Sequence, residues 1–134
     1  IRDDGLVARV RGLDATFEGL LRDGLGARSE VGDIRGRGFF RGIELVADRT
    51  TKRPFPATAG LAKRIKAAAF DLGLICYPGS GLILYSRRTR GGIDGDHVLL
   101  APPFIATEDE LALAVDRLGQ AIDRAMADAG LRAA

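Results

Sequence analysis

The last third of the chain places a short apolar run before a long helical repeat. Most of residues 97–101 are apolar and β-prone. Pro102 and Pro103 follow, and prolines cannot donate backbone hydrogen bonds to a sheet. Thr107 and Glu110 have the spacing of a capping box, in which each side chain bonds to the other residue's amide. An apolar stripe at helical spacing follows: Leu111, Val115, Leu118, Ile122 and Met126. The pattern predicts a buried strand, a rigid corner and an amphipathic helix over 107–128.

The first third predicts a helix and then β structure. Over residues 1–26, apolar residues recur at helical spacing between charged ones: Leu6, Val10, Leu13, Phe17 and Leu20. Residues 31–46 alternate in hydrophobicity after the glycine-rich break Gly36-Arg37-Gly38, which predicts a turn or bulge. A phosphate-binding loop is the less favoured interpretation of this break, because no helix starts within a turn of it and no Lys-Ser/Thr pair is present.

The middle third predicts a loop, a second helix and a short strand. Residues 48–56 are charged and then proline-rich, which disfavours helix. A helical repeat runs from about Thr58 to Gly73, and its apolar positions share one face: Leu61, Ile65, Ala68 and Leu72. Leu74–Tyr77 is continuously apolar and predicts a short buried strand, after which residues 78–81 predict a turn.

Together these elements predict an α+β fold in a single domain over 1–134. We expect a two-layer sandwich, in which helices pack on a small antiparallel or mixed sheet. The first helix takes 1–26, the sheet and its intervening helix take 31–104, and the last helix takes 107–128.

Composition narrows the classes of protein. A chain of 134 residues suits one domain with one core. A net charge of +2 is too small to indicate a nucleic-acid partner, and no apolar run approaches the roughly 20 residues that span a bilayer. The single cysteine, Cys76, cannot form an internal disulfide, which favours a buried thiol in a reducing, cytoplasmic compartment. The start at Ile1 lacks an initiator methionine and a signal-peptide pattern, which we expect of a part of a longer protein.

Three segments resemble the class III aminotransferases, which are pyridoxal-phosphate enzymes of fold type I. Residues 95–104, Gly-Asp-His-Val-Leu-Leu-Ala-Pro-Pro-Phe, are similar to the family's carboxyl-terminal signature. Residues 31–46 resemble the first strand region of its small domain, and residues 73–78 resemble the next strand. The resemblance covers nearly the whole chain in the family's order, and it covers only the small C-terminal domain. It implies a large cofactor-binding domain that these residues do not include.

The resemblance implies that no residue here is catalytic or cofactor-binding. In the family, the Schiff-base lysine and the aspartate at the pyridine nitrogen belong to the large domain. The lysines of this chain, Lys52, Lys63 and Lys66, fall in a charged loop or on a polar helix face. His97 has no neighbours at metal-ligand spacing, so we expect no metal and interpret it as a hydrogen-bonded histidine at a strand end. Pyridoxal phosphate is expected in the full-length enzyme and is not expected to bind this fragment, which would be inactive alone.

The small domain of the resembled enzymes supplies part of the substrate wall. In ornithine-type and acetylornithine-type members, an arginine just before the Ala-Pro-Pro corner grips the substrate carboxylate. Leu99 occupies the matching position here, which favours an amine or ω-amino acid substrate. Tyr77, Pro78 and Gly79 come at a strand end, where a loop can face the cofactor. We therefore predict these four residues to be substrate-facing, although a packed strand end is the stronger interpretation for the last three from the residues alone.

The implied function is transfer of an amino group between an amine or amino acid and a keto acid, by a homodimer that includes the large domain. The alternative is an independent α+β binding module that uses its sheet or the arginine-rich segment 87–90 for a partner. Residues 82–92 depart from the family pattern and predict an inserted hairpin or a long loop. Without its large domain, the chain is expected to expose apolar surface, with Phe17 or Leu20 of the first helix as candidates.

Overall fold

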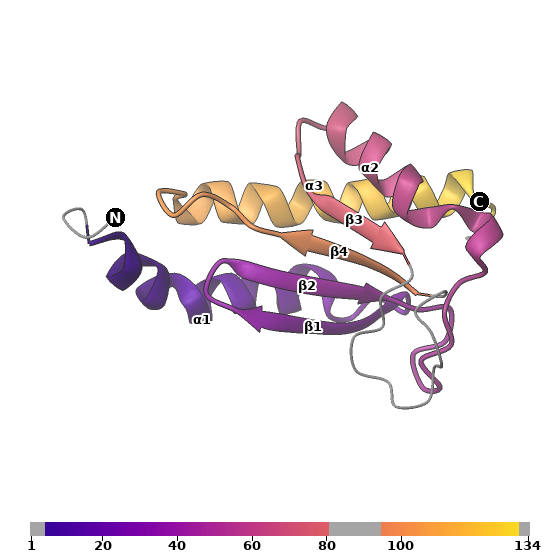
Figure 1. Cartoon of the computed structure of the whole chain (residues 1–134), viewed down its shortest axis with the longest axis horizontal. Coiled ribbons are helices and arrows are strands. Elements are labelled where there is room, and N and C mark those ends of the chain that lie inside the picture. Colours follow the sequence, from indigo (N-terminus) through magenta and orange to yellow (C-terminus); the bar gives the residue numbers. More distant parts are fainter. Residues whose placement is uncertain (1–4, 81–94, 132–134) are drawn as a thin grey trace.

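The computed structural model describes residues 5–80 and 95–131 and shows an α+β fold in two layers (Figure 1). In this part of the chain, a four-stranded sheet forms one layer and three helices pack on it. The elements are α1 (Leu6–Leu25), β1 (Val31–Arg37), β2 (Phe40–Leu45), the 3-10 turn η1 (Ala57–Ala59), α2 (Leu61–Asp71), β3 (Tyr77–Ser80), β4 (Asp96–Leu100) and α3 (Glu108–Asp128). Every strand pair is antiparallel, which settles the choice between an antiparallel and a mixed sheet.

The order of the strands in the sheet differs from their order along the chain. β1 and β2 form a hairpin, β2 pairs with β4, and β4 pairs with β3, so the order is β1-β2-β4-β3. β4 alternates along its length, as a half-buried strand should. Asp96, Val98 and Leu100 are buried, whereas His97 and Leu99 are only partly buried and lie on the opposite face.

α3 begins at the predicted capping box. The Thr107 side chain accepts a hydrogen bond from the Glu110 amide at 3.3 Å, and the Glu110 carboxylate accepts one from the Thr107 amide at 2.8 Å. All five positions of the predicted stripe are buried: Leu111, Val115, Leu118, Ile122 and Met126. Burial of a large apolar side chain contributes about 1.5–3 kcal/mol. The predicted amphipathic helix is therefore confirmed, and its packing against α1 and α2 builds much of the core.

α1 buries the apolar residues that we expected to mark an exposed surface. Phe17 is fully buried, with its ring edge-on to Phe39 at a centroid distance of 5.8 Å. Leu20 is partly buried against the core. The expectation for these two residues is wrong, because the hairpin and α3 cover this side of α1. The helix ends where the sequence allows it to, at Gly26.

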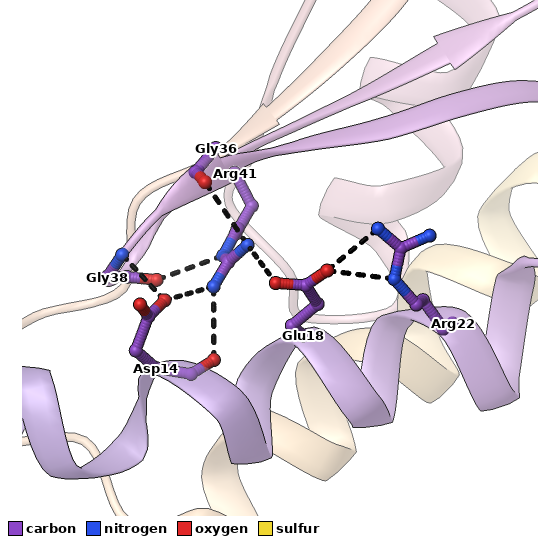
Figure 2. A network of polar contacts seen from close by, with 6 residues as sticks. All are labelled: Asp14, Glu18, Arg22, Gly36, Gly38 and Arg41. Carbon is purple, nitrogen blue, oxygen red and sulfur yellow. Dashed lines mark hydrogen bonds and ion pairs between the residues drawn. The ribbon is translucent and has the colours of Figure 1, made fainter.

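A buried arginine joins the β1–β2 hairpin to α1, as Figure 2 shows. Arg41 is only 2% exposed. Its guanidinium donates to three backbone carbonyls, those of Gly36 at 3.3 Å, Gly38 at 3.0 Å and Asp14 at 3.0 Å. It also pairs with the Asp14 carboxylate and, at 3.1 Å, with Glu18. The Asp14 carboxylate in turn accepts the Gly38 amide at 2.8 Å, so the hairpin turn is held from both sides.

Glu18 belongs to two ion pairs, one with Arg22 and one with Arg41 (Figure 2). Hydrogen bonds from Arg22 and then from Arg41 lower the pKa of Glu18 below its ordinary value. A carboxyl group whose pKa falls on folding stabilises the protein above its ordinary pKa. This contribution is lost as the pH falls through the lowered value.

α2 follows the predicted helix with a later start. It begins at Leu61, after η1 takes up residues 57–59, and its buried positions include the predicted Leu61, Ile65 and Ala68. Gly73 follows the helix with a φ of 75°, the left-handed conformation that favours glycine at a helix end.

β3 begins three residues later than the sequence predicts. Leu74–Cys76 precede the strand, and the predicted turn at 78–81 overlaps the strand itself. Among the strands of the described residues, β3 lies at the edge of the sheet and pairs only with β4. An edge strand tolerates Pro78, because the proline can face away from the ladder. The position of β3 is therefore determined by its pairing with β4. It is not determined by the apolar residues that precede it in the sequence.

Three further expectations concern the rest of the chain. Cys76 is buried as predicted, and burial raises the pKa of its thiol. Among the described helices, none is long and apolar enough to cross a bilayer. The predicted insertion at 82–92 and the arginine-rich segment 87–90 lie outside the described residues.

Candidate substrate-facing site

The β3–β4 pair brings together the residues predicted to face substrate. Tyr77 pairs with Leu99, Pro78 pairs with Val98, and Gly79 pairs with His97. Residues directly opposite each other in an antiparallel pair have their side chains on the same face. Tyr77, Gly79 and Leu99 therefore share one face of the sheet. Pro78 lies on the other face with the buried Val98, so it does not join the three.

This face is the one that the helices leave uncovered. α1 and α2 contact the opposite face, through Arg41 and Asp96 respectively, and α1 and α3 run behind the strands in Figure 1. The register aligns Arg35, Gly42, Leu99 and Tyr77 in one row across all four strands. Tyr77 is 62% exposed at the end of this row. The sheet thus presents an open surface whose β3–β4 side is apolar and aromatic.

The charged side of the open face is paired within itself. Arg35 donates to Asp33 at 2.7 Å and to Glu44 at 3.1 Å. These exposed pairs contribute little stability but occupy the guanidinium. Arg35, which lies two strands away from Leu99 in the same row, is therefore already paired with carboxylates of this face.

His97 differs from its expectation. Its Nδ1 atom is buried and has no hydrogen-bond partner among the described residues, so the expected hydrogen-bonded strand-end histidine is not formed through this atom. The His97 ring lies over Gly79, where a Cβ atom would come within 2.8 Å of two ring atoms. Glycine at position 79 therefore makes room for the imidazole on the open face.

Asp96, the neighbour of His97, lies on the helical side of the sheet. Its carboxylate accepts the Ala62 amide at 3.3 Å, in the first turn of α2, whose N-cap Gly60 offers no side chain. Burial raises the pKa of Asp96, although the Ala62 amide and the charge on His97 act in the opposite direction. Asp96 thus serves α2 as a helix-capping acceptor supplied by a distant strand.

Asp96→Asn is expected to gain stability relative to the wild type as the pH rises. An acid whose pKa rises on folding stabilises the fold less as the pH increases from its ordinary value through the raised one. Asparagine keeps the acceptor without the charge, so the slope of stability against pH should be more positive in this variant than in the wild type, while Asp96→Ala should lose about 1 kcal/mol with the helix-capping bond. Urea unfolding from about pH 4 to pH 7 measures both changes. An unchanged slope in Asp96→Asn would contradict the assignment.

The three lysines of the chain lie on its surface. The cofactor needs an amine for its aldehyde, an acid near the pyridine nitrogen and a cradle for the phosphate. Lys52, Lys63 and Lys66 are all exposed, and the Lys52 ammonium donates to the Gly32 carbonyl. An exposed amine lacks the apolar surroundings that the Schiff-base role requires, so these lysines do not fit that role. Over 5–80 and 95–131, no group of three His, Cys, Asp or Glu side chains could hold a metal ion.

Comparisons with known proteins identify the family. No family model matches the chain. An aminotransferase from Gibberella zeae is 37% identical over 123 residues, which are 91% of this chain and 23% of the relative. An omega-transferase from Vibrio fluvialis JS17 superposes with a TM-score of 0.79 at 32% identity, covering 98% of this chain and 28% of that one. The PMP-bound form of an aminotransferase from Vibrio fluvialis gives 0.75 at 34% identity, over 93% of this chain and 24% of that one.

The chain belongs to the pyridoxal-phosphate-dependent class III aminotransferases. It corresponds to a domain-sized part of such a transaminase, because it spans about a quarter of the length of the relatives that it matches.

Proposed function

We propose that this chain is the small domain of a pyridoxal-phosphate-dependent transaminase, and that the cofactor is held by a separate large domain of the same enzyme. The family membership and the share of the relatives' length support this assignment. The exposed positions of Lys52, Lys63 and Lys66 support a Schiff-base lysine elsewhere in the enzyme. The complete enzyme is proposed to be a homodimer in the cytoplasm, consistent with the buried free thiol of Cys76.

The role of the small domain is to form one wall of the substrate pocket, with Tyr77, Gly79 and Leu99 as the facing residues. The observation that carries this proposal is the apolar pair Tyr77–Leu99 on the uncovered face of the sheet. A carboxylate in this place would meet no free cation in the described part of the wall, because Arg35 is held by Asp33 and Glu44. The part of the substrate that touches the wall therefore carries no carboxylate. A carboxylate at the far end of the substrate, as in an ω-amino acid, is held by another part of the enzyme.

Leu99→Arg in the complete enzyme tests this wall. An arginine on the open face could bind a carboxylate through a charge-assisted, bidentate pair. We expect the ratio of kcat/KM for an α-amino acid to that for an amine without a carboxylate to rise roughly tenfold or more. Leu99→Met, which conserves volume and adds no charge, serves as the control and should leave the ratio within about threefold.

Two results would reject the proposal at different levels. A folded Leu99→Arg enzyme with an unchanged ratio would show that this face does not meet the substrate. A complete wild-type protein that shows no visible absorption of bound pyridoxal phosphate and transfers no amino group would reject the transaminase assignment itself.

A further inference from the structure

A groove opens where the segment before β3, the proline corner and the first half of α3 meet. Its volume is about 700 Å³. We call it the corner groove and define its walls by Ile75, Tyr77, Ile105 and Leu113. Phe17, which is buried in the core, also borders it.

The walls of the corner groove carry several exposed apolar side chains. Ile75 is 77% exposed, Ile105 69% and Leu113 45%, and Tyr77 is also exposed. These four are half of the eight large apolar side chains that are exposed in the described residues. Apolar side chains gathered at one surface mark a site of contact with another molecule or domain.

The charged residues of the corner groove are already committed to the fold. Arg117 donates to the Gly73 carbonyl at 3.1 Å. Glu110 is held in the capping box with Thr107, whose hydrogen bonds lower the pKa of Glu110. A charged metabolite would find neither residue free to bind it. The groove instead suits an apolar protein surface.

The corner groove is fixed before anything binds to it. Arg9 of α1 donates to the Ala106 carbonyl at 2.7 Å, and the Ala106 amide donates to the Pro103 carbonyl at 2.9 Å. The two prolines and the capping box restrict the same corner further. Docking on such a preorganised surface orders few additional groups, which lowers the entropic cost of the contact.

We propose that the corner groove is the surface on which the cofactor-binding domain of the same enzyme docks. This inference rests on the proposed function, and it names the part of the small domain that makes the contact. The relatives carry about three quarters of their length outside the matched region, so a full enzyme has a large body that this chain must touch. Tyr77 belongs both to the groove and to the proposed substrate wall. Docking at the groove would therefore bring that wall to the cofactor.

Hydrogen exchange of the complete enzyme, as the wild type and as two variants, tests the proposal. Backbone amides over 104–113 should be protected from exchange in the wild-type enzyme. Ile105→Asp in the complete enzyme should remove most of this protection, because it places an unpaired charge in the contact. Phe70→Asp is the matched control: Phe70 is 71% exposed but lies outside the corner groove, and its variant should keep the protection.

The other outcomes separate the hypotheses. Equal exchange over 104–113 in Ile105→Asp and in the cofactor-loaded wild-type enzyme would overturn the docking site and leave the transaminase assignment intact. Protection that is lost when the enzyme is diluted to monomers would assign the corner groove to a second copy, and this too would overturn the proposal. Loss of protection in both variants would show that the effect is not specific to the groove. A complete protein that never binds pyridoxal phosphate would reject the proposed function and the docking partner with it.

Discussion

Replacing Arg41 with methionine should lower the free energy of unfolding by about 3–5 kcal/mol. Methionine fills part of the same space but leaves the carbonyls of Gly36, Gly38 and Asp14 without the donor that each has in the wild type. A buried acceptor that loses its partner bears its full desolvation cost. Asp14 would also lose the guanidinium that faces it.

Arg35→Met in the same hairpin is the control for Arg41→Met. Arg35 lies on the uncovered face and pairs with Asp33 and Glu44 where water screens the charges. Its loss should cost less than about 1 kcal/mol. Urea unfolding at neutral pH measures both variants. Similar losses in the two would show that Arg41 acts as an ordinary surface charge and that the network in Figure 2 does not secure the hairpin.

Gly36→Ala should destabilise the chain by about 2–4 kcal/mol. Gly36 has a φ of 143°, which residues with a side chain rarely adopt. A Cβ atom there would lie 2.1 Å from the Phe40 carbonyl oxygen and 2.9 Å from the Arg41 Cα atom. Both are backbone atoms, so relief of the collision requires the hairpin itself to move.

Gly19→Ala in the same chain is expected to have the opposite effect and to raise the free energy of unfolding. Gly19 lies inside α1, and a Cβ atom there would meet nothing within 4 Å. Alanine in a helix interior is favoured over glycine, so this variant should gain about 0.5–1 kcal/mol. Thermal and urea unfolding of the two variants give the comparison. A Gly36→Ala protein as stable as the wild type would mean that the hairpin accommodates a side chain at this position.

Residues that act locally were predictable from the sequence. The Thr107–Glu110 capping box and the stripe from Leu111 to Met126 need only neighbours along one helix, and both form as expected. The glycine-rich break likewise marks the hairpin turn. The start of β3 was not predictable, because its register comes from pairing with β4 and the apolar run before it suggests an earlier strand.

Contacts between distant segments explain the rest. Arg41 occupies an inward position of an alternating strand, and a charge at such a position indicates a buried partner. The residues near Arg41 in the sequence do not identify Asp14 and Glu18 as its partners. The candidate site shows the same limit. The resemblance proposes Tyr77 and Leu99 separately, and only the strand register makes them direct neighbours on one open face.

The strand order β1-β2-β4-β3 determines when each strand can pair during synthesis on the ribosome. β2 ends at Leu45, but β4, its second neighbour, begins only at Asp96. At roughly 5–20 residues per second, about 50 residues of translation leave one side of β2 unpaired for roughly 3–10 s. During that interval the nascent hairpin has a free edge that another chain could pair with. A chaperone that shields nascent chains should therefore act between the emergence of β2 and that of β4.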